Sequence, residues 1–376
     1  MPWIIVYYLF VLSVAMQFGF ALYFFIRIFN LPGKEGTPLS KRSPVSVVIC
    51  AKNEAANLKK NLPIVLSQGY YDENGKRNFE VIVVNDASDD GTEAVLKDLE
   101  MRYDNLWGVV ILPDAERNLK GKKFALSKGI AHAANGWLVL TDADCVPASN
   151  KWLERMVAPL AQGKEIVAGY GGHNQSGGIL NAFIRWETMH TFLQYSTYAL
   201  AGIPYMAVGR NLACTKAIFQ RASQTDIWNV LPSGDDDLMV SIAGTAENTA
   251  IVAGATAFTW SDTKNNWQEW VKQKQRHLST GKYYKKNIKL LLGGYAAAHA
   301  AMWFVFWFLL FSKYWQAALI IMTARCLLYW MLWAITAGKI KEKGLIYLFP
   351  LFDIGWMVYN FAFFPYITWK NRQHWK

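Results

Sequence analysis

The sequence has few cysteines, and their arrangement excludes two common kinds of stabilised small domain. The chain has four cysteines, and no two of them form a CxxC pair; they are Cys50, Cys145, Cys214 and Cys326. Such wide spacing is typical of reduced, buried thiols rather than of a disulfide framework or a structural zinc site. Reduced thiols favour a cytoplasmic location for the domain that contains them.

Several motifs of large protein classes are also missing. No GxGxxG follows the first predicted strand, and GxxxxGK[ST] and the serine-centred GxSxG are absent from the chain. A dinucleotide oxidoreductase, a P-loop NTPase and an α/β-hydrolase are therefore poorly supported. His132, His173 and His190 lack the spacing of zinc ligands. Because no helix-turn-helix, zinc-finger or RNP-type pattern is present, we expect no nucleic-acid partner.

Long hydrophobic runs, in contrast, occur at both ends of the chain. The first run, 4–26, is uncharged and reaches the roughly 20 residues that a bilayer core requires. It lacks the basic start and the cleavage site of a signal peptide, so we interpret it as a transmembrane anchor. Three further runs are candidate spans: 291–311, 314–337 and 345–369.

Basic residues predict how these spans are oriented. Arg27 and Arg42 follow the first run together with two lysines, so the positive-inside rule places the N-terminus outside and the central domain in the cytoplasm. A straight fourth span would leave the basic tail 370–376 outside. We therefore expect 345–369 to be re-entrant or interfacial, or the rule to fail there. Arg325 and Asp353 are costly in lipid, and either pair with each other or contact a substrate.

A basic and aromatic segment precedes the second hydrophobic run. The net charge of the chain is +11, and residues 264–289 hold eight Lys or Arg against one acid, Glu269. Tryptophans and tyrosines are interleaved with these charges. Because the segment leads directly into an apolar run, we expect it to lie on an anionic membrane face.

Between the spans, the pattern predicts an α/β domain. Continuous apolar, β-branched runs alternate with segments of helical spacing, which is typical of a mostly parallel sheet. The predicted strands are 45–51, 79–85, 107–112 and 136–142, and the predicted helices are 53–68, 90–103 and 122–135. Asp89 or Asp90 is in position to cap the second helix.

Polar residues follow three of these strands. They are the segment from Ala51 to Glu54, which includes Asn53, then Asp86, and then the pair Asp142 and Asp144. Because the carboxyl ends of parallel strands form one edge of the sheet, we expect these groups to converge. Closely spaced carboxylates bind hard cations such as Mg²⁺ or Mn²⁺, which complete their shell with phosphate oxygens and water.

In order and type, these segments resemble the family 2 glycosyltransferases, which have the GT-A fold, over roughly residues 44–280. SVVICAKNEAANL resembles the nucleotide-binding strand and loop of that family, VIVVNDASDDGT its uracil-reading element, and TDADC its DxD motif. The resemblance implies that Asp86 reads the base and that Ala51, Asn53, Glu54 and Lys122 line the nucleotide pocket. It also implies that Asp144 is the metal ligand, with Asp142 beside it.

The resemblance extends to the acceptor side. GRNLACTKAIF resembles the acceptor loop and implies that Gly209 and Asn211 lie near the transferred sugar, while SGDDDLMV resembles the segment of the catalytic base. Asp235 aligns with the base, but Gly234 replaces the usual preceding Glu, so Asp236 stays an alternative. QKQRH resembles the QxxRW motif, which implies roles for Gln273, Arg276 and His277. His277 in place of Trp argues against a processive enzyme.

These features together predict an inverting, metal-dependent transferase in the inner or plasma membrane, with a cytoplasmic catalytic domain. We expect a nucleotide-sugar donor with UDP, and a lipid or lipid-linked glycan acceptor. A processive polysaccharide synthase is the alternative, and a non-catalytic membrane scaffold a remote one; the oligomeric state is not predicted. The expected parts are an anchor (1–29), the transferase domain (30–262), an interfacial segment (263–290), C-terminal spans (291–369) and a basic tail (370–376).

Overall fold

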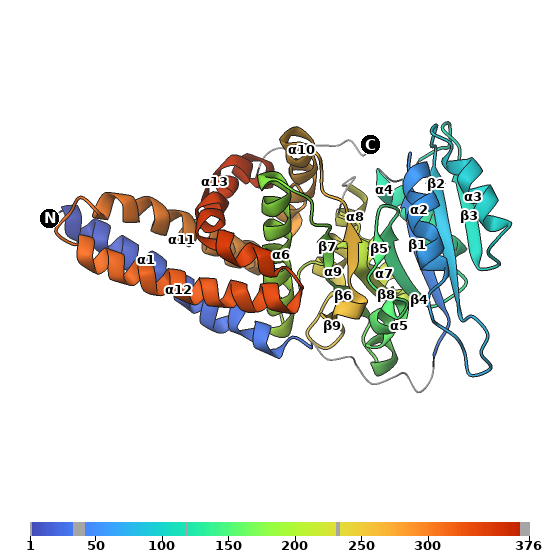
Figure 1. The fold of residues 1–376 in the computed structure, drawn as a ribbon, viewed down its shortest axis with the longest axis horizontal. Coiled ribbons are helices and arrows are strands. Elements are labelled where there is room, and N and C mark those ends of the chain that lie inside the picture. The colour runs from blue at the N-terminus through green and yellow to red at the C-terminus, as the bar shows by residue number, and fades with distance from the viewer. Residues whose placement is uncertain (1, 33–41, 118, 120, 231–233, 369–376) are drawn as a thin grey trace.

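The computed structural model describes residues 2–32, 42–117, 119, 121–230 and 234–368. Helices from both ends of the chain form one end of the elongated molecule, and an α/β domain forms the other (Figure 1). The predicted basic tail, 370–376, lies outside the described residues. The membrane-directed and sheet-forming parts of the sequence are therefore separated in space as they are along the chain.

The α/β domain is built on a seven-stranded sheet with the order β3-β2-β1-β4-β8-β6-β9. Strands β1 to β4 are parallel, whereas β8 runs antiparallel to both β4 and β6. This confirms the mostly parallel sheet that the alternating pattern predicts. The strands are β1 (Val45–Ala51), β2 (Phe79–Asp86), β3 (Leu106–Ile111), β4 (Trp137–Asp142), β6 (Ile166–Gly169), β8 (Leu212–Thr215) and β9 (Thr249–Val252).

A smaller sheet continues from the carboxyl ends of the large one. Its strands are β5 (Val146–Pro147), β10 (Thr259–Ser261) and β7 (Gly171–His173), in the order β5-β10-β7. Because β5 begins four residues after the end of β4, the loop that carries Asp144 lies where the two sheets meet.

Helices cover both faces of the large sheet. α2 (Ala55–Leu66), α3 (Thr92–Glu100) and α5 (Trp152–Val157) pack on one face. α4 (Lys122–His132) packs on the other, where a Cβ on Gly129 would come within 2.7 Å of Val48 Cγ1. Glycine therefore sets the close approach of α4 to the sheet. The smaller elements are η2 (Leu160–Gln162), η3 (Gly209–Asn211), η4 (Ala255–Ala257), α7 (Lys216–Ser223), α8 (Asp226–Val230) and α9 (Asp237–Ala243).

One long helix, α6 (Ile179–Leu200), joins the α/β domain to the helical end of the molecule. Its Arg185 forms a buried ion pair with Glu342, which follows α12 (Trp315–Lys339). Its Glu187 pairs with Lys274 of α10 (Trp267–Leu278). The two parts of the molecule are therefore connected by charged contacts as well as by a continuous apolar core.

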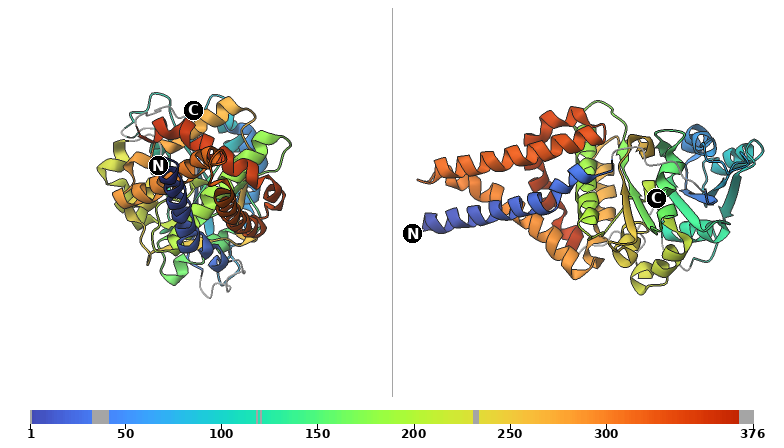
Figure 2. Two further views of the ribbon diagram at one scale, coloured as in Figure 1. Left: turned by 90° about the vertical axis from the view of Figure 1, so that its left-hand side faces the viewer. Right: turned by 90° about the horizontal axis from the view of Figure 1, so that it is seen from below.

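Three helices extend away from the α/β domain as a bundle, as the right-hand view of Figure 2 shows. They are α1 (Pro2–Tyr23), α11 (Lys286–Leu309) and α12. The short helix η1 (Phe25–Asn30) follows α1, and η5 (Gly281–Tyr283) precedes α11. The fourth predicted segment forms η6 (Lys343–Leu348) and α13 (Phe349–Thr368). Among the described residues, four helices are long and apolar enough to cross a membrane, and they start at Trp3, Lys286, Trp315 and Lys343.

The course of α13 differs from that of the three bundle helices. Phe349 at its start packs against Trp333, near the end of α12, and Phe363 near its end packs against Trp270 of α10. Since α10 and the end of α12 both adjoin the α/β domain, both ends of α13 lie on that side of the bundle (Figure 1).

Between α13 and the bundle lies a buried polar cluster. The Arg325 guanidinium pairs with the Asp353 carboxylate, which also accepts from Trp303 Nε1 at 3.0 Å. Gln17 Oε1 accepts from Arg325 Nη2 at 3.1 Å. Arg325 is fully buried. Of the two roles considered for Arg325 and Asp353, the structure shows the mutual ion pair.

Candidate functional site

The loops that follow β1 and β2 are locked to each other by side-chain hydrogen bonds. The Asn53 backbone N–H donates to Ser88 Oγ at 2.9 Å, and Asn53 Oδ1 accepts from the Asp89 N–H at 3.0 Å. Asn53 has a φ of 57°, a left-handed conformation that Asn tolerates better than most residues. Asp90, rather than Asp89, receives the N–H of Thr92 at the start of α3. This leaves Ala51 and Glu54 at the same sheet edge as Asp86.

Asp86, at the end of β2, is fully buried and paired with an arginine that the sequence motifs do not include. Arg117 Nη2 lies 2.6 Å from Asp86 Oδ1, and Nη1 lies 3.3 Å from Oδ2. The same guanidinium lies over the ring of Phe124, 5.3 Å from its centroid. Both oxygens of the predicted base-reading carboxylate are thus engaged by one side chain.

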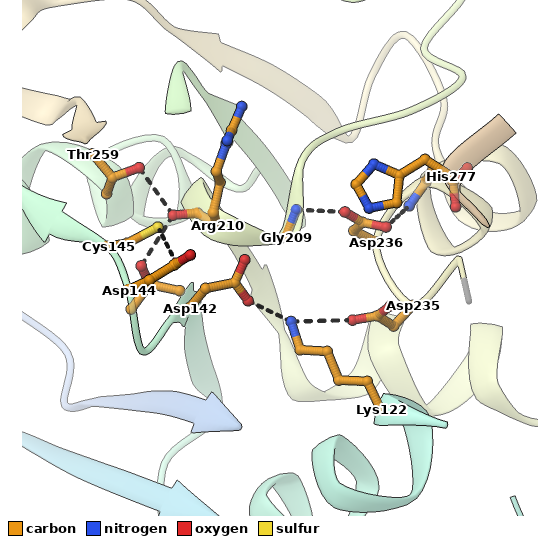
Figure 3. Close-up of polar contacts among 12 residues, drawn as sticks. Lys122, Asp142, Asp144, Cys145, Gly209, Arg210, Asp235, Asp236, Thr259 and His277 are labelled. Atoms are coloured by element: carbon orange, nitrogen blue, oxygen red, sulfur yellow. Dashed lines mark hydrogen bonds and ion pairs between the residues drawn. The ribbon is translucent and has the colours of Figure 1, made fainter. Parts of the chain in front are cut away.

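Lys122 links the DxD segment to the predicted base segment (Figure 3). Its Nζ lies 2.5 Å from Asp142 Oδ1 and 3.6 Å from Asp235 Oδ2. Burial lowers the pKa of Lys122, but the two carboxylates outweigh it and raise the pKa well above its usual range. The ammonium group therefore stays charged and holds two acidic segments, separated by more than 90 residues in sequence, at one point.

Asp144 follows Asp142 at the sheet edge and belongs to a group of metal-type ligands. Ligand atoms of Asp142, Asp144 and Cys145 all lie within 4.8 Å of one another. Desolvation and the carboxylates of Asp142 and Glu54 raise the pKa of Asp144. A cation would relieve this repulsion, and carboxylate oxygens are the donors that Mg²⁺ and Mn²⁺ prefer. The residues present therefore fit a divalent metal.

The three consecutive aspartates at the start of α9 have three different surroundings. Asp236 Oδ2 accepts from the Gly209 N–H, and its Oδ1 accepts from the Asp237 N–H at 2.8 Å. Asp237 is buried and accepts from Thr280 Oγ1 and Tyr284 Oη. Asp235 is the member that faces Lys122 (Figure 3). Burial and the flanking carboxylates of Asp235 and Asp237 raise the pKa of Asp236 to about 7.

Gly234 stands where the resembled motif has Glu, and the structure gives a reason for glycine here. Its φ is 83°, and a Cβ would come within 2.8 Å of Leu238 Cδ1. The turn into α9 therefore requires a residue without a side chain.

The structure places Gly209 and Asn211 differently. Gly209 contacts Asp236, whereas Asn211 is fully buried beneath the site. Asn211 Nδ2 donates to the carbonyls of Tyr170 and Ala257, both at 2.8 Å, and its Oδ1 accepts from Trp152 Nε1 at 2.9 Å. With these bonds made, the amide anchors the loop to the core. This geometry does not support the predicted contact between Asn211 and the acceptor.

On α10, Gln273 is half-buried one turn before Arg276, and His277 is exposed. Arg276 Nη2 lies 3.2 Å from His277 Nε2. Burial raises the pKa of Asp142, but Lys122, Arg210 and Arg276 lower it below its usual range. Arg276 is therefore one of the positive charges that act on the DxD segment. Thr280, two residues after α10, donates to Asp237 Oδ2, which brings the end of α10 to the same site.

Comparisons with known proteins agree with this arrangement. Residues 46–213 match the family model "Glycosyl transferase family 2". The chain carries a family 2 glycosyltransferase domain. The mannosyltransferase PcManGT from Pyrobaculum calidifontis, solved with GDP-Man and Mn²⁺, superposes with a TM-score of 0.59 at 18% identity, covering 93% of this chain and 99% of its own. This likeness confirms the GT-A fold.

Curated glycosyltransferases are also similar to this chain. Glycosyltransferase AglE of Haloferax volcanii is 36% identical over 126 residues, which are 33% of this chain and 38% of AglE. The probable glycosyltransferase YdaM of Bacillus subtilis is 25% identical over 275 residues, which are 71% of this chain and 62% of YdaM. The aligned part thus spans less than two thirds of each of these relatives.

Two arginines of the glycosyltransferase domain were missed by sequence reasoning. Arg117 precedes the segment KGKK, and Arg210 lies between the two motif residues Gly209 and Asn211. Arg210 Nη1 lies 2.9 Å from His173 Nε2. The Arg210 carbonyl accepts from Thr259 Oγ1 at 3.0 Å (Figure 3). Both arginines adjoin motif residues, which is the one signal in the sequence that points to them.

Proposed function

We propose that this protein is a membrane-bound glycosyltransferase that moves a sugar from a nucleoside diphosphate to a lipid or lipid-linked acceptor. The observation that carries the proposal is the junction at Lys122, where the DxD segment and the aspartates of α9 meet. A nucleotide diphosphate bound at the sheet edge would place its sugar between these two groups of carboxylates. UDP is the proposed donor nucleotide, because the segment around Asp86 resembles a uracil-reading element.

The residues divide the chemistry between them. Asp144 and Asp142 would hold Mg²⁺ or Mn²⁺, which when bound offsets the negative charge that the leaving diphosphate gains. Arg276 supplies fixed positive charge in the same region. Asp235 is the proposed general base, because both oxygens of Asp236 already accept backbone N–H groups. A base that removes the acceptor proton accelerates such a step by roughly 10²–10⁴-fold.

A single displacement of this kind inverts the configuration of the anomeric carbon. Asp235 takes the proton of the acceptor hydroxyl as its oxygen bonds to the anomeric carbon, and the bond from that carbon to the diphosphate oxygen breaks. The diphosphate leaves with the bonding electron pair. No covalent intermediate on the protein is required.

The acceptor side is argued from the helices that adjoin the site. α10 carries Arg276 and His277, and Trp270 of the same helix packs against Phe363 of α13. Both ends of α13 lie on the side of the α/β domain, so we propose that α13 lies in the membrane interface, and that the domain and the basic tail share the cytoplasmic side. A lipid-borne hydroxyl would then reach the site along α10. His277 in place of Trp supports transfer of one sugar rather than processive synthesis.

The test is a screen of radiolabelled nucleotide sugars on membranes that contain the full chain, with and without Mn²⁺, followed by sizing of the products. We expect transfer from a UDP-sugar into the lipid fraction, dependent on the metal and abolished in Asp144→Ala. Transfer by Asp144→Ala at the wild-type rate would refute the metal assignment. A long polymer from the purified enzyme and donor alone would favour the processive alternative.

A further inference from the structure

A polar cavity of about 160 Å³ adjoins Asp144. Its walls come from α2, from the loop after β4 and from the segments that follow β7 and β10. Asp144 lines it, whereas neither Lys122 nor Asp235 does. A cavity of this size has room for several water molecules. Of the residues given roles above, Asp144 and Glu54 line this space, and the other lining residues have no role so far.

Asn61 is the feature of the cavity that most needs an explanation. Its side chain is 96% buried, with 4% of its surface exposed, and Nδ2 donates to the Ala143 carbonyl at 3.2 Å. That bond fixes which end of the amide is the nitrogen. Within the described part of the chain, no group hydrogen-bonds Asn61 Oδ1, although the residue lines the cavity. A buried acceptor left without a partner costs about 1–3 kcal/mol, so a donor is expected there.

Carboxylates supply the other oxygen ligands of the cavity. Glu54, Asp144 and Asp262 all line it. Neighbouring asparagines orient two of them: Asn57 Nδ2 donates to Glu54 Oε2 at 2.6 Å, and Asn174 Nδ2 donates to Asp262 Oδ1 at 2.7 Å. Carboxylate and amide oxygens together are the donor set of a hard, hydrated cation.

The charge balance of the cavity also favours a cation. Lys60 and Lys264 line it as well, so three carboxylates face two ammonium groups. Lys60 is exposed and Lys264 half-buried, and both can extend toward solvent. An anion would gain no net attraction from this set of charges, whereas a cation and its water shell would.

We propose that Asn61 and Asp262 are positioning residues for the divalent cation on Asp144, and that they accept hydrogen bonds from water molecules of its shell. The inference rests on the proposed function, because it requires a metal at Asp144. It extends that function to residues outside the DxD motif. Asn61 also holds the Ala143 carbonyl, so the same side chain orients the loop that carries the ligand. Groups that orient the shell of a metal commonly change its affinity by about 10–100-fold.

The test is a titration of the purified full-length protein with Mn²⁺ alone, in which free Mn²⁺ is followed by electron paramagnetic resonance. We expect Asn61→Leu to weaken binding by about 10–100-fold, because it removes the acceptor. Asn61→Asp also loses the donor to the Ala143 carbonyl but keeps an oxygen acceptor at this position, so it should bind Mn²⁺ more tightly than Asn61→Leu. Water-proton relaxation should also report a changed shell of the bound Mn²⁺ in Asn61→Leu.

Gln68→Leu is the matched control. Gln68 is another buried amide close to α2, bonded to the Ile64 and Ser149 carbonyls and lying outside the cavity. Its loss should lower the melting temperature and leave Mn²⁺ affinity unchanged. If Gln68→Leu weakens Mn²⁺ binding as much as Asn61→Leu, the effect is general destabilisation and the inference is wrong.

Asp262→Ala keeps the inference testable if Asn61→Leu does not fold, because Asp262 is exposed and its removal leaves the core intact. We expect weaker Mn²⁺ binding by about tenfold. Wild-type affinity in Asp262→Ala or in folded Asn61→Leu would overturn the inference. If the wild type itself binds no Mn²⁺, with or without UDP, the proposed metal-dependent function fails instead.

Discussion

Arg117 covers Asp86 in this structure, with two hydrogen bonds from the guanidinium to the buried carboxylate. The carboxylate is therefore closed to solvent, and the base of a bound nucleotide can reach it only if Arg117 moves aside. The motif around Asp86 indicates a residue that reads the base, but it gives no sign of this partner.

The pair predicts an asymmetry between two substitutions. Arg117→Ala leaves a buried carboxylate without its counter-charge, whereas Asp86→Asn leaves a guanidinium that is 30% exposed and can be hydrated. Removing one partner of a buried pair is costly mainly for the charge that stays buried. We expect Arg117→Ala to lower the melting temperature more than Asp86→Asn, measured by thermal unfolding in detergent. The reverse order would show that Asp86 is solvated in the absence of Arg117.

The aspartates of α9 predict a separation between catalysis and folding. Asp235→Asn should bind UDP but lose transfer by at least about 10²-fold, since the base is gone. Asp236→Asn should lower the melting temperature. Each carboxylate oxygen of Asp236 accepts a backbone N–H, and the asparagine NH2 group would replace one of these two acceptors. Transfer rates and UDP binding of both variants check this. Loss of transfer in Asp236→Asn, with unchanged stability, would move the base assignment to Asp236.

The raised pKa of Asp236 predicts how stability depends on pH. With a pKa of about 7 in the folded protein, against the usual 3.8, the folded state binds more protons between these values. The contribution of Asp236 to the free energy of unfolding therefore falls as the pH rises from about 4 to 7. We expect melting temperatures measured without metal to decline less steeply across this window in Asp236→Asn than in the wild type. Parallel curves would contradict the assignment.

Asn211 predicts a structural rather than an acceptor phenotype. Asn211→Ala removes three hydrogen bonds and leaves the buried Trp152 N–H and the Ala257 carbonyl without their partner, whereas the Tyr170 carbonyl still accepts from the Thr259 N–H. At about 1–3 kcal/mol for each unpaired buried group, we expect a loss of several kcal/mol in stability. At a temperature where the variant is folded, the acceptor KM should stay close to that of the wild type. A large increase in KM with unchanged stability would restore the predicted contact with the acceptor.

Much of the fold follows from local sequence patterns. Strands β1, β2 and β4 are buried and continuously apolar because helices cover both faces of the sheet there, whereas the edge strand β3 is apolar but partly exposed. The positions of all four strands agree with the predicted ones within one residue. The antiparallel strand β8 has no such signal. Its residues were assigned to a motif, and its direction depends on where α6 returns the chain.

The residues of the candidate site that could be predicted are those whose type and position in the chain together suggest a single role. Asp142, Asp144 and Asp235 are acidic side chains at strand or helix ends. In the structure Lys122 joins Asp142 to Asp235, and Asp144 lies beside Asp142. The contact of Asn211 with the acceptor stays a prediction, because an amide can serve a core as well as a sugar; in the structure its side chain bonds Trp152 and two carbonyls of the core. Arg117 was missed because its partner, Asp86, lies 31 residues away.

The ion pair between Arg185 and Glu342 has a further consequence. It fastens the long helix beneath the sheet to the turn where the chain leaves α12. Under the proposed function, this pair would hold the catalytic edge of the sheet at a fixed distance from the membrane. An incoming lipid would then be selected by how far its head group projects from the membrane, rather than by the length of its tail.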